Sequence, residues 1–247
     1  MFTVLFDYTL LITPGLILVA ACLILARNLT SPGISIAVLV AGFILIRDAM
    51  TPAGIWRIGA AGGVAPWIRL TDDVGLLVTF SVVTVAITAC ILITQPKLRV
   101  LVVWGRPSPT VIGFGIAGAA VAAAPVLLLS QWWPLVERGG AVLLTSLPAI
   151  LLFCLCGNLL EEVLFRGFLQ GRLDQLTTRL RAAVLSGLLF AVCHIFLATT
   201  VTDVGWPLLV FTAWEGLICA WLRLRFGLIP AVMAHGLAIA SLTSGLL

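Results

Sequence analysis

Apolar runs of membrane-spanning length recur along the whole chain. A helix of roughly 20 apolar residues crosses about 30 Å of hydrocarbon. On this basis the hydrophobic pattern predicts eight spans: Thr9–Ala26, Gly33–Ile46, Val74–Gln95, Thr110–Ser130, Ala141–Leu160, Ala182–Thr200, Pro207–Leu222 and Leu228–Leu247. The second is the shortest, and the helix of the fifth is expected to run on through the charged residues that follow it. The pattern therefore predicts an all-α polytopic membrane protein with about eight transmembrane helices.

Polar or Gly/Pro-rich connections separate these runs. Tryptophan at such positions is typical of the membrane interface, and a basic segment with an apolar patch favours lying on the surface. We expect four such connections: an interfacial stretch over Arg47–Asp73, a basic surface segment over Pro96–Pro109, an interfacial loop over Gln131–Gly140 and a polar connection over Gln170–Arg181.

Composition supports the same class of protein. Of the 247 residues, 62% are hydrophobic and 10% are charged, whereas soluble domains carry about 25% charged residues. The excess of basic residues lies in the connections, which is typical of membrane topology and not of nucleic-acid binding. The cysteines fall inside apolar runs, where they behave as small hydrophobic residues, so no disulfide framework is predicted: Cys22, Cys90, Cys154, Cys156, Cys193 and Cys219.

Lysine and arginine are distributed unevenly between the two sides of the predicted bundle. The connections after odd-numbered spans hold Arg27, Lys97, Arg99, Arg106, Arg166, Arg172, Arg179, Arg181, Arg223 and Arg225, and those after even-numbered spans hold Arg47, Arg57, Arg69 and Arg138. By the positive-inside rule both termini are outside. The prediction is a multi-pass protein, in a bacterial cell one of the inner membrane, with the charged end of the fifth run toward the cytoplasmic side.

Two adjacent acids and an arginine end the fifth apolar run. Ionisable groups within a membrane cost several kcal/mol and mark functional sites. In a helix, Glu162 and Arg166 lie one turn apart in the order that favours an ion pair. Glu161 lies on the other flank of a polar stripe that Asn158 begins, which leaves it free for chemistry.

The only two histidines, His194 and His235, lie within separate apolar runs, as does Glu215. A lone histidine there is more often a packing residue, but two histidines and an acid pair together favour a catalytic site. Glu161 is a candidate general base for hydrolysis, with an imidazole as proton donor. Zinc held by Glu161, His194 and His235 is the alternative, although no His-Glu-x-x-His pair is present. Glu215 is interpreted either as a cavity residue or as an interfacial acid.

The order Glu161-Glu162-x-x-x-Arg166, Phe190-x-x-x-His194 and a late His235 resembles the three motifs of the CAAX protease and bacteriocin-processing (CPBP) intramembrane proteases, which include the Abi-type proteins. The resemblance covers roughly Leu151 to the end of the chain. It implies a CAAX-endoprotease-like helical core in which Glu161 activates water, Glu162 and Arg166 structure the site, His194 assists proton transfer and His235 binds the oxyanion. It implies no required metal.

One position departs from the family pattern. The third motif usually has Asn or Asp four residues after the histidine, and here that residue is Ile239. If that amide is the oxyanion donor of the family, this chain must use another group, and Asn158, Ser241 and Thr243 are candidates. Losing one such donor typically costs about 10² to 10³ in rate.

The sequence therefore divides into N-terminal transmembrane helices and interfacial loops (1–140) and a catalytic transmembrane core (141–247). We expect an endopeptidase acting on a membrane-associated protein: a prenylated CAAX-like tail, a bacteriocin leader or a C-terminal sorting tail. The alternatives are a non-proteolytic scaffold or immunity protein of the same fold, which Ile239 favours, and a transporter, which the absence of an internal repeat disfavours.

Overall fold

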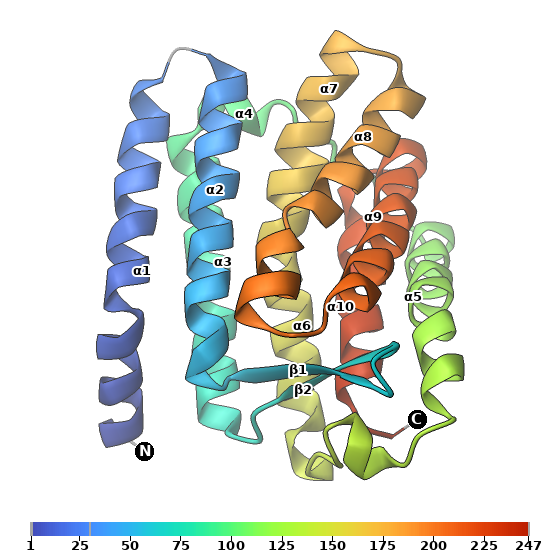
Figure 1. Ribbon diagram of the computed structural model, residues 1–247. Coiled ribbons are helices and arrows are strands. Elements are labelled where there is room, and N and C mark those ends of the chain that lie inside the picture. Colours follow the sequence, from blue (N-terminus) through green and yellow to red (C-terminus); the bar gives the residue numbers. More distant parts are fainter. Residues whose placement is uncertain (1, 30, 247) are drawn as a thin grey trace.

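The computed structural model describes residues 2–29 and 31–246 and forms a helical bundle with one short hairpin (Figure 1). The main helices and strands, in chain order, are α1 (Phe2–Asn28), α2 (Pro32–Met50), β1 (Trp56–Ala61), β2 (Ala65–Leu70), α3 (Val74–Thr94), α4 (Pro96–Arg99), α5 (Pro109–Ser130), α6 (Leu147–Glu162), α7 (Gln170–Leu176), α8 (Arg179–Val192), α9 (Trp206–Phe226) and α10 (Leu228–Thr243). The shorter elements are the 3-10 turns η1 (Thr51–Ala53), η2 (Leu135–Arg138) and η3 (Leu144–Ser146) and the π-helical segments η4 (Val163–Leu169) and η5 (Leu197–Val201).

Helix starts follow local rules that the sequence carries. The carboxylate of Asp73 caps α3 by accepting from the Leu76 amide, and the hydroxyl of Ser108 caps α5 by accepting from the Val111 amide. These side chains satisfy amide groups that the helix itself leaves unbonded. Proline in the first turn of α2 suits a position where no amide donor is needed.

Seven helical segments of the described chain are long and apolar enough to cross a membrane, and they correspond to the first seven predicted spans. The fold class is therefore that of an integral multi-pass membrane protein. The eighth predicted span is shorter than expected: α10 has 16 residues and ends at Thr243, a length of about 24 Å. It packs against α5, α6 and α9 near the centre of the bundle (Figure 1).

The fifth span does not end at Leu160. The helical segment runs over Leu144–Leu176, through η4, so Glu161 lies near its middle and not at the end that was predicted to face the cytoplasm. The expected polar connection over Gln170–Arg181 is wrong for its first part, which forms α7. Gln170 is wholly buried there because its amide donates to the carbonyl of Ala220 on α9 at 3.0 Å, which offsets the cost of burying it.

The connection predicted over Arg47–Asp73 also differs from expectation. Its first residues complete α2, and β1 and β2 then form an antiparallel hairpin in which Trp56 is opposite Leu70. Arg69 anchors the hairpin by donating to the carbonyls of Gly140 and Leu242. Burial, with Arg138 and Arg57 nearby, lowers the pKa of Arg69 to about 10, so this side chain remains charged at pH 7. Short apolar strands between glycines have a weak sequence signal, which is why the hairpin was missed.

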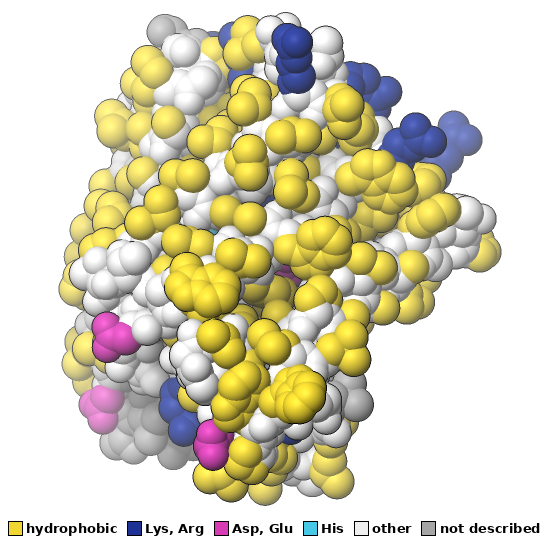
Figure 2. Space-filling view, turned by 45° about the vertical axis from the view of Figure 1, so that its right-hand side comes forward, with side chains coloured by type: hydrophobic (Ala, Val, Ile, Leu, Met, Phe, Trp, Pro, Cys, Tyr) yellow, Lys and Arg dark blue, Asp and Glu magenta, His cyan; other side chains and the backbone are white. Residues whose placement is uncertain are grey.

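The surface is apolar around its middle and charged toward its ends. Figure 2 shows Lys and Arg side chains gathered at the end of the bundle that carries α4 and α7, and acidic side chains toward the opposite end. Both chain ends lie at this opposite end (Figure 1). Large apolar side chains such as Leu11, Ile17 and Ile24 of α1 are exposed. Such a belt is suited to lipid, because hydrocarbon surrounds this part of a spanning protein.

Helices α8 and α9 pack closely at Gly187 and Gly216. A Cβ atom on Gly216 would lie 2.8 Å from the carbonyl oxygen of Gly187 and 3.4 Å from a guanidinium nitrogen of Arg166. We expect Gly216→Ala to separate the two helices and to lower the free energy of unfolding by about 1 to 3 kcal/mol, the usual cost of overpacking.

Gly113→Ala is the matched control, because a Cβ atom at this helical position of α5 would meet nothing within 4 Å. Alanine in a helix is favoured over glycine, so this variant should be neutral or slightly stabilising. Thermal unfolding of both variants in the same detergent tests the prediction. Equal melting temperatures would show that the α8–α9 contact is looser than the structure indicates.

Candidate active site

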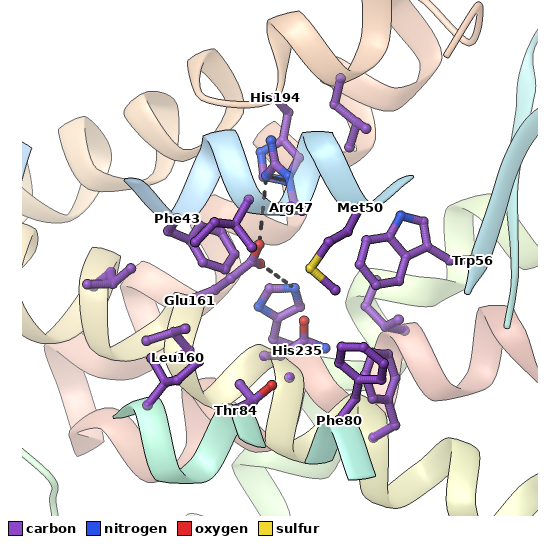
Figure 3. A pocket seen from close by; sticks show the side chains of 18 of the residues that line it. Phe43, Arg47, Met50, Trp56, Phe80, Thr84, Leu160, Glu161, His194 and His235 are labelled. Carbon is purple, nitrogen blue, oxygen red and sulfur yellow. Dashed lines mark hydrogen bonds and ion pairs between the residues drawn. The ribbon is translucent and has the colours of Figure 1, made fainter. Parts of the chain in front are cut away.

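A cavity of about 250 Å³ lies at the centre of the bundle, and its wall is mostly apolar (Figure 3). Helices α1, α2 and α3, the hairpin and helices α6, α8, α9 and α10 all contribute to this wall. Six of the residues singled out from the sequence line it: Asn158, Glu161, Phe190, His194, Glu215 and His235. Glu162 and Arg166 are wholly buried behind the wall. The predicted constellation is therefore gathered at one place, although its parts come from four helices.

The wall also shows how the two parts of the chain are related. Residues of α1 to α3 and of the hairpin, such as Phe43, Phe80 and Trp56, face the same cavity as the motif residues (Figure 3). The division into 1–140 and 141–247 stays a prediction, and the cavity takes walls from both sides of it.

Glu162 is held in place by two partners. Its Oε1 atom lies 3.0 Å from Nη1 of Arg166 and accepts a hydrogen bond of 2.9 Å from Nδ1 of His235. The expected ion pair within one helical turn is therefore present. Arg166 also donates to the carbonyl of Gly216 and lies 4.2 Å from the ring centroid of Phe190, a cation–π contact. These contacts tie α6, α8, α9 and α10 together around one buried carboxylate.

Glu161 has a different environment from its neighbour. Its Oε1 atom lies 3.7 Å from Nη1 of Arg47, and its Oε2 atom lies 3.6 Å from Nε2 of His235. Both distances exceed that of a hydrogen bond, and the described residues provide no closer partner. Figure 3 shows Glu161 between Arg47 and His194 on one side and His235 on the other. Glu161 is thus the acid of the pair whose oxygens remain available in the cavity.

His235 has one ring nitrogen engaged and one directed at the cavity. Because a carboxylate only accepts hydrogen bonds, the contact with Glu162 assigns the proton to Nδ1. Nε2 then lies 3.6 Å from an oxygen of Glu161 and 3.6 Å from an oxygen of Glu215. Glu162 therefore orients the imidazole so that its free nitrogen faces the unbonded acids.

His194 has both ring nitrogens engaged. Nδ1 lies 2.8 Å from the carbonyl of Phe190, which can only accept, so this nitrogen carries the proton. Nε2 is then an acceptor, and it lies 2.9 Å from Nη1 of Arg47. His194 lies beside Glu161 (Figure 3), but its lone pair is directed at a guanidinium. In this arrangement no ring nitrogen is free for the proton-transfer role that the family resemblance implied.

Arg47 is the site residue that the sequence reasoning missed. It lies in the last turn of α2, pairs with Asp48 and donates to the carbonyl of Cys193. The hydrophobic pattern ends the second predicted span at Ile46, which leaves Arg47 in a connection on the outer side. A signal was available, because the apolar run Gly33–Ile46 is shorter than the roughly 20 residues that a span needs, and extending it includes Arg47 and Asp48.

Glu215 and Asn158 also line the cavity wall. Glu215 is almost wholly buried in α9, so its position in the structure is in the cavity and not at an interface. Asn158 is half-buried one turn before Glu161, and its amide makes no side-chain hydrogen bond with any described residue. The six cysteines are free thiols.

Among the described residues, the three expected zinc ligands are not grouped as a metal site. Within residues 2–29 and 31–246 no three His, Cys, Asp or Glu side chains are grouped so that they could hold a metal ion. His194, one of the three proposed ligands, has its lone pair directed at a guanidinium, which competes with any cation. The geometry therefore disagrees with the zinc alternative in this arrangement of the side chains.

Fold and site together define a class: a helical membrane protein with a buried acid and histidine cluster around an apolar cavity. Residues 143–240, less than half of the chain, match the model of a family described as type II CAAX prenyl endopeptidase Rce1-like. This match confirms the resemblance that the motifs predicted: residues 143–240 are similar to the CAAX prenyl endopeptidase family. Neither the curated proteins nor the solved structures include a significant match to the chain.

Proposed function

We propose that the protein is an intramembrane endopeptidase that hydrolyses a peptide bond of a membrane-associated protein, with Glu161 as the general base. The observation that carries this proposal is the difference between the two adjacent acids. Glu162 is buried and bonded to Arg166 and His235, whereas Glu161 faces the cavity with no hydrogen bond to any described side chain. The family match at residues 143–240 supports an endopeptidase at the level of the family.

The arrangement supports a direct attack by water. A water molecule hydrogen-bonded to Glu161 can give up a proton to the carboxylate as its oxygen attacks the scissile carbonyl. Nε2 of His235 lies 3.6 Å from Oε2 of Glu161, so it can contact a water molecule that this carboxylate holds. Glu162 and Arg166 act on the reaction through His235, because they fix the orientation of its ring.

The substrate is proposed to be an apolar or lipid-bearing segment. Apart from the cluster around Glu161, the cavity wall consists mainly of Ile, Leu, Val, Phe and Trp side chains. A prenylated tail, a leader or a C-terminal sorting tail each supplies such a segment. We propose that the reaction uses no metal, since the donors do not converge. We also propose that the end rich in Lys and Arg faces the cytoplasm, in line with the positive-inside rule.

Comparison of membrane-protein termini by mass spectrometry tests the proposed function. Source cells that lack the protein would be complemented with wild type or with Glu161→Gln. We expect one class of protein to keep its leader or tail in the deletion strain and in the Glu161→Gln strain, and to lose it with wild type. Addition of a chelator to the purified enzyme should leave the cleavage of that substrate unchanged.

The opposite outcome is equally definite. If all termini are the same in the three strains, and Glu161→Gln still rescues the phenotype of the deletion, the protein is a scaffold of the protease fold. The replacement of the usual amide by Ile239 is the feature that favours this second reading.

A further inference from the structure

The cavity lacks a polar side chain where the family pattern has one. Ile239 lines the wall and packs against the buried apolar cluster that includes Leu70 and Ile150. The two hydroxyl groups considered as substitutes are not placed to help. Ser241 donates to the carbonyl of Leu237 and Thr243 to that of Ile239, and neither residue lines the cavity. His235, to which the family resemblance gives this role, directs its Nδ1 proton at Glu162. The oxyanion formed during peptide hydrolysis therefore needs a donor from another part of the wall.

Arg47 offers such a donor from the side of Glu161 that is opposite His235 (Figure 3). A guanidinium has five N–H groups. In Arg47, Nε donates to Asp48, one Nη1–H group lies toward His194, and one Nη2–H group donates to the carbonyl of Cys193. Each Nη atom keeps a second N–H group. Arg47 lines the cavity, and its Nη1 atom lies 3.7 Å from Glu161.

The contacts of Arg47 fix its position. Three hydrogen bonds hold the guanidinium, to Asp48, to the carbonyl of Cys193 and to Nε2 of His194. Donors that are held before the reaction stabilise developing charge without a reorganisation cost. The neutral form of His194 accepts from Arg47, so this histidine serves to aim the guanidinium. A cation also forms stronger hydrogen bonds to an oxyanion than a neutral amide such as that of Asn158.

We infer that Arg47 is the oxyanion-binding residue of this protein and that His194 is its positioning residue. This inference rests on the proposed function. As the water oxygen bonds to the scissile carbon, Glu161 takes a water proton and the electron pair of the carbonyl bond moves to oxygen, where Arg47 binds it. When that pair returns, the C–N bond breaks and the amine leaves with the proton from Glu161. One peptide and one water thus give one carboxylic acid and one amine.

Cleavage of a peptide that spans the site identified from the termini comparison tests the inference in purified protein. Arg47→Gln should lower kcat by about 10² to 10³-fold, the usual effect of losing one oxyanion donor, with a much smaller change in KM. Ile239→Asn alone should have little effect, whereas Arg47→Gln/Ile239→Asn should recover at least about tenfold of the lost kcat because an amide is restored. Arg27→Ala, at an exposed position, is the control.

Two further variants separate folding and positioning from catalysis. If Arg47→Gln fails to fold because Asp48 is left buried without its partner, Arg47→Gln/Asp48→Asn removes that charge and is measured in its place. His194→Gln should lower kcat in the wild-type background and add little to Arg47→Gln, because both changes remove the same guanidinium contact. If the two losses of kcat multiply in the double variant, His194 acts separately as a proton carrier, and its positioning role is wrong.

The outcomes distinguish this inference from the proposed function. Suppose that wild type cleaves the peptide, that Glu161→Gln does not, and that folded Arg47→Gln keeps kcat within about threefold of wild type. This loss is well below that expected for an oxyanion donor. The role of Arg47 is then wrong, and the proposed endopeptidase function is retained. If Asn158→Ala alone causes the loss, the donor is Asn158. If wild type and Glu161→Gln leave the same termini in cells, the proposed function fails and the role of Arg47 fails with it.

Discussion

Replacement of Glu161 by glutamine is expected to lower the rate of peptide hydrolysis by about 10² to 10⁴-fold, the range for loss of a general base. Glutamine has nearly the same shape as glutamate but cannot take a proton from water at neutral pH. Because Glu161 makes no hydrogen bond with the described residues, the variant should fold and melt like wild type. The rate is measured with purified protein and a peptide that spans the natural cleavage site.

Glu137→Gln is the matched control, because Glu137 is exposed in η2 outside the bundle core. It makes the same chemical change and should leave the rate unaltered. Glu161→Asp adds a second arm: it keeps the acid but withdraws it from the reacting water, and a displacement of about 1 Å can cost about 10²-fold. A folded Glu161→Gln variant with the wild-type rate would remove Glu161 from the mechanism.

Replacement of Arg166 by alanine is expected to have the largest effect on stability. Arg166 is fully buried, lies 3.0 Å from Glu162, donates to the carbonyl of Gly216 and contacts the Phe190 ring. Breaking a buried ion pair by removing one partner typically costs about 3 to 5 kcal/mol, because the other charge stays buried without compensation. We expect a matching fall in the melting temperature in detergent and in the amount of protein in membranes.

Three variants show whether this loss comes from the buried pair. Arg181→Ala removes an arginine from an exposed position and should be neutral. Arg166→Lys keeps the charge but loses the planar group that reaches both partners, so it should recover only part of the stability. Glu162→Gln/Arg166→Met removes both charges and should be more stable than Arg166→Ala. If Arg166→Ala melts like Arg181→Ala, the pair contributes nothing to the fold.

The stability of this pair and the chemistry of Glu161 are linked by His235. The ring is held by Glu162, and Glu162 is held by Arg166, so a loss at Arg166 releases the nitrogen that faces Glu161. Variants of Arg166 that still fold should therefore lose activity as well. Variants of Glu161 should lose activity without losing stability, and this contrast separates the two acids.

Features that depend on local geometry could be predicted from the order of the amino acids. Apolar runs of spanning length placed the first seven membrane helices, since the thickness of hydrocarbon fixes the length of a span. The helical repeat placed Glu162 and Arg166 on one face and left Glu161 on another, because residues four apart lie one turn apart. The order of three short motifs was enough for the family resemblance that the match at residues 143–240 confirmed.

Contacts between groups from distant segments could not be predicted in this way, because they depend on how the helices pack. Arg47 and His194 are 147 positions apart, and no local pattern indicates that a residue at the end of α2 lies beside α8. The burial of Gln170 could not be predicted either, because its amide donates to a carbonyl of α9, which is distant in the sequence. Periodicity is set by the backbone of one segment, whereas these contacts are set by how whole helices pack, and that packing placed a guanidinium beside the acid that the sequence had singled out.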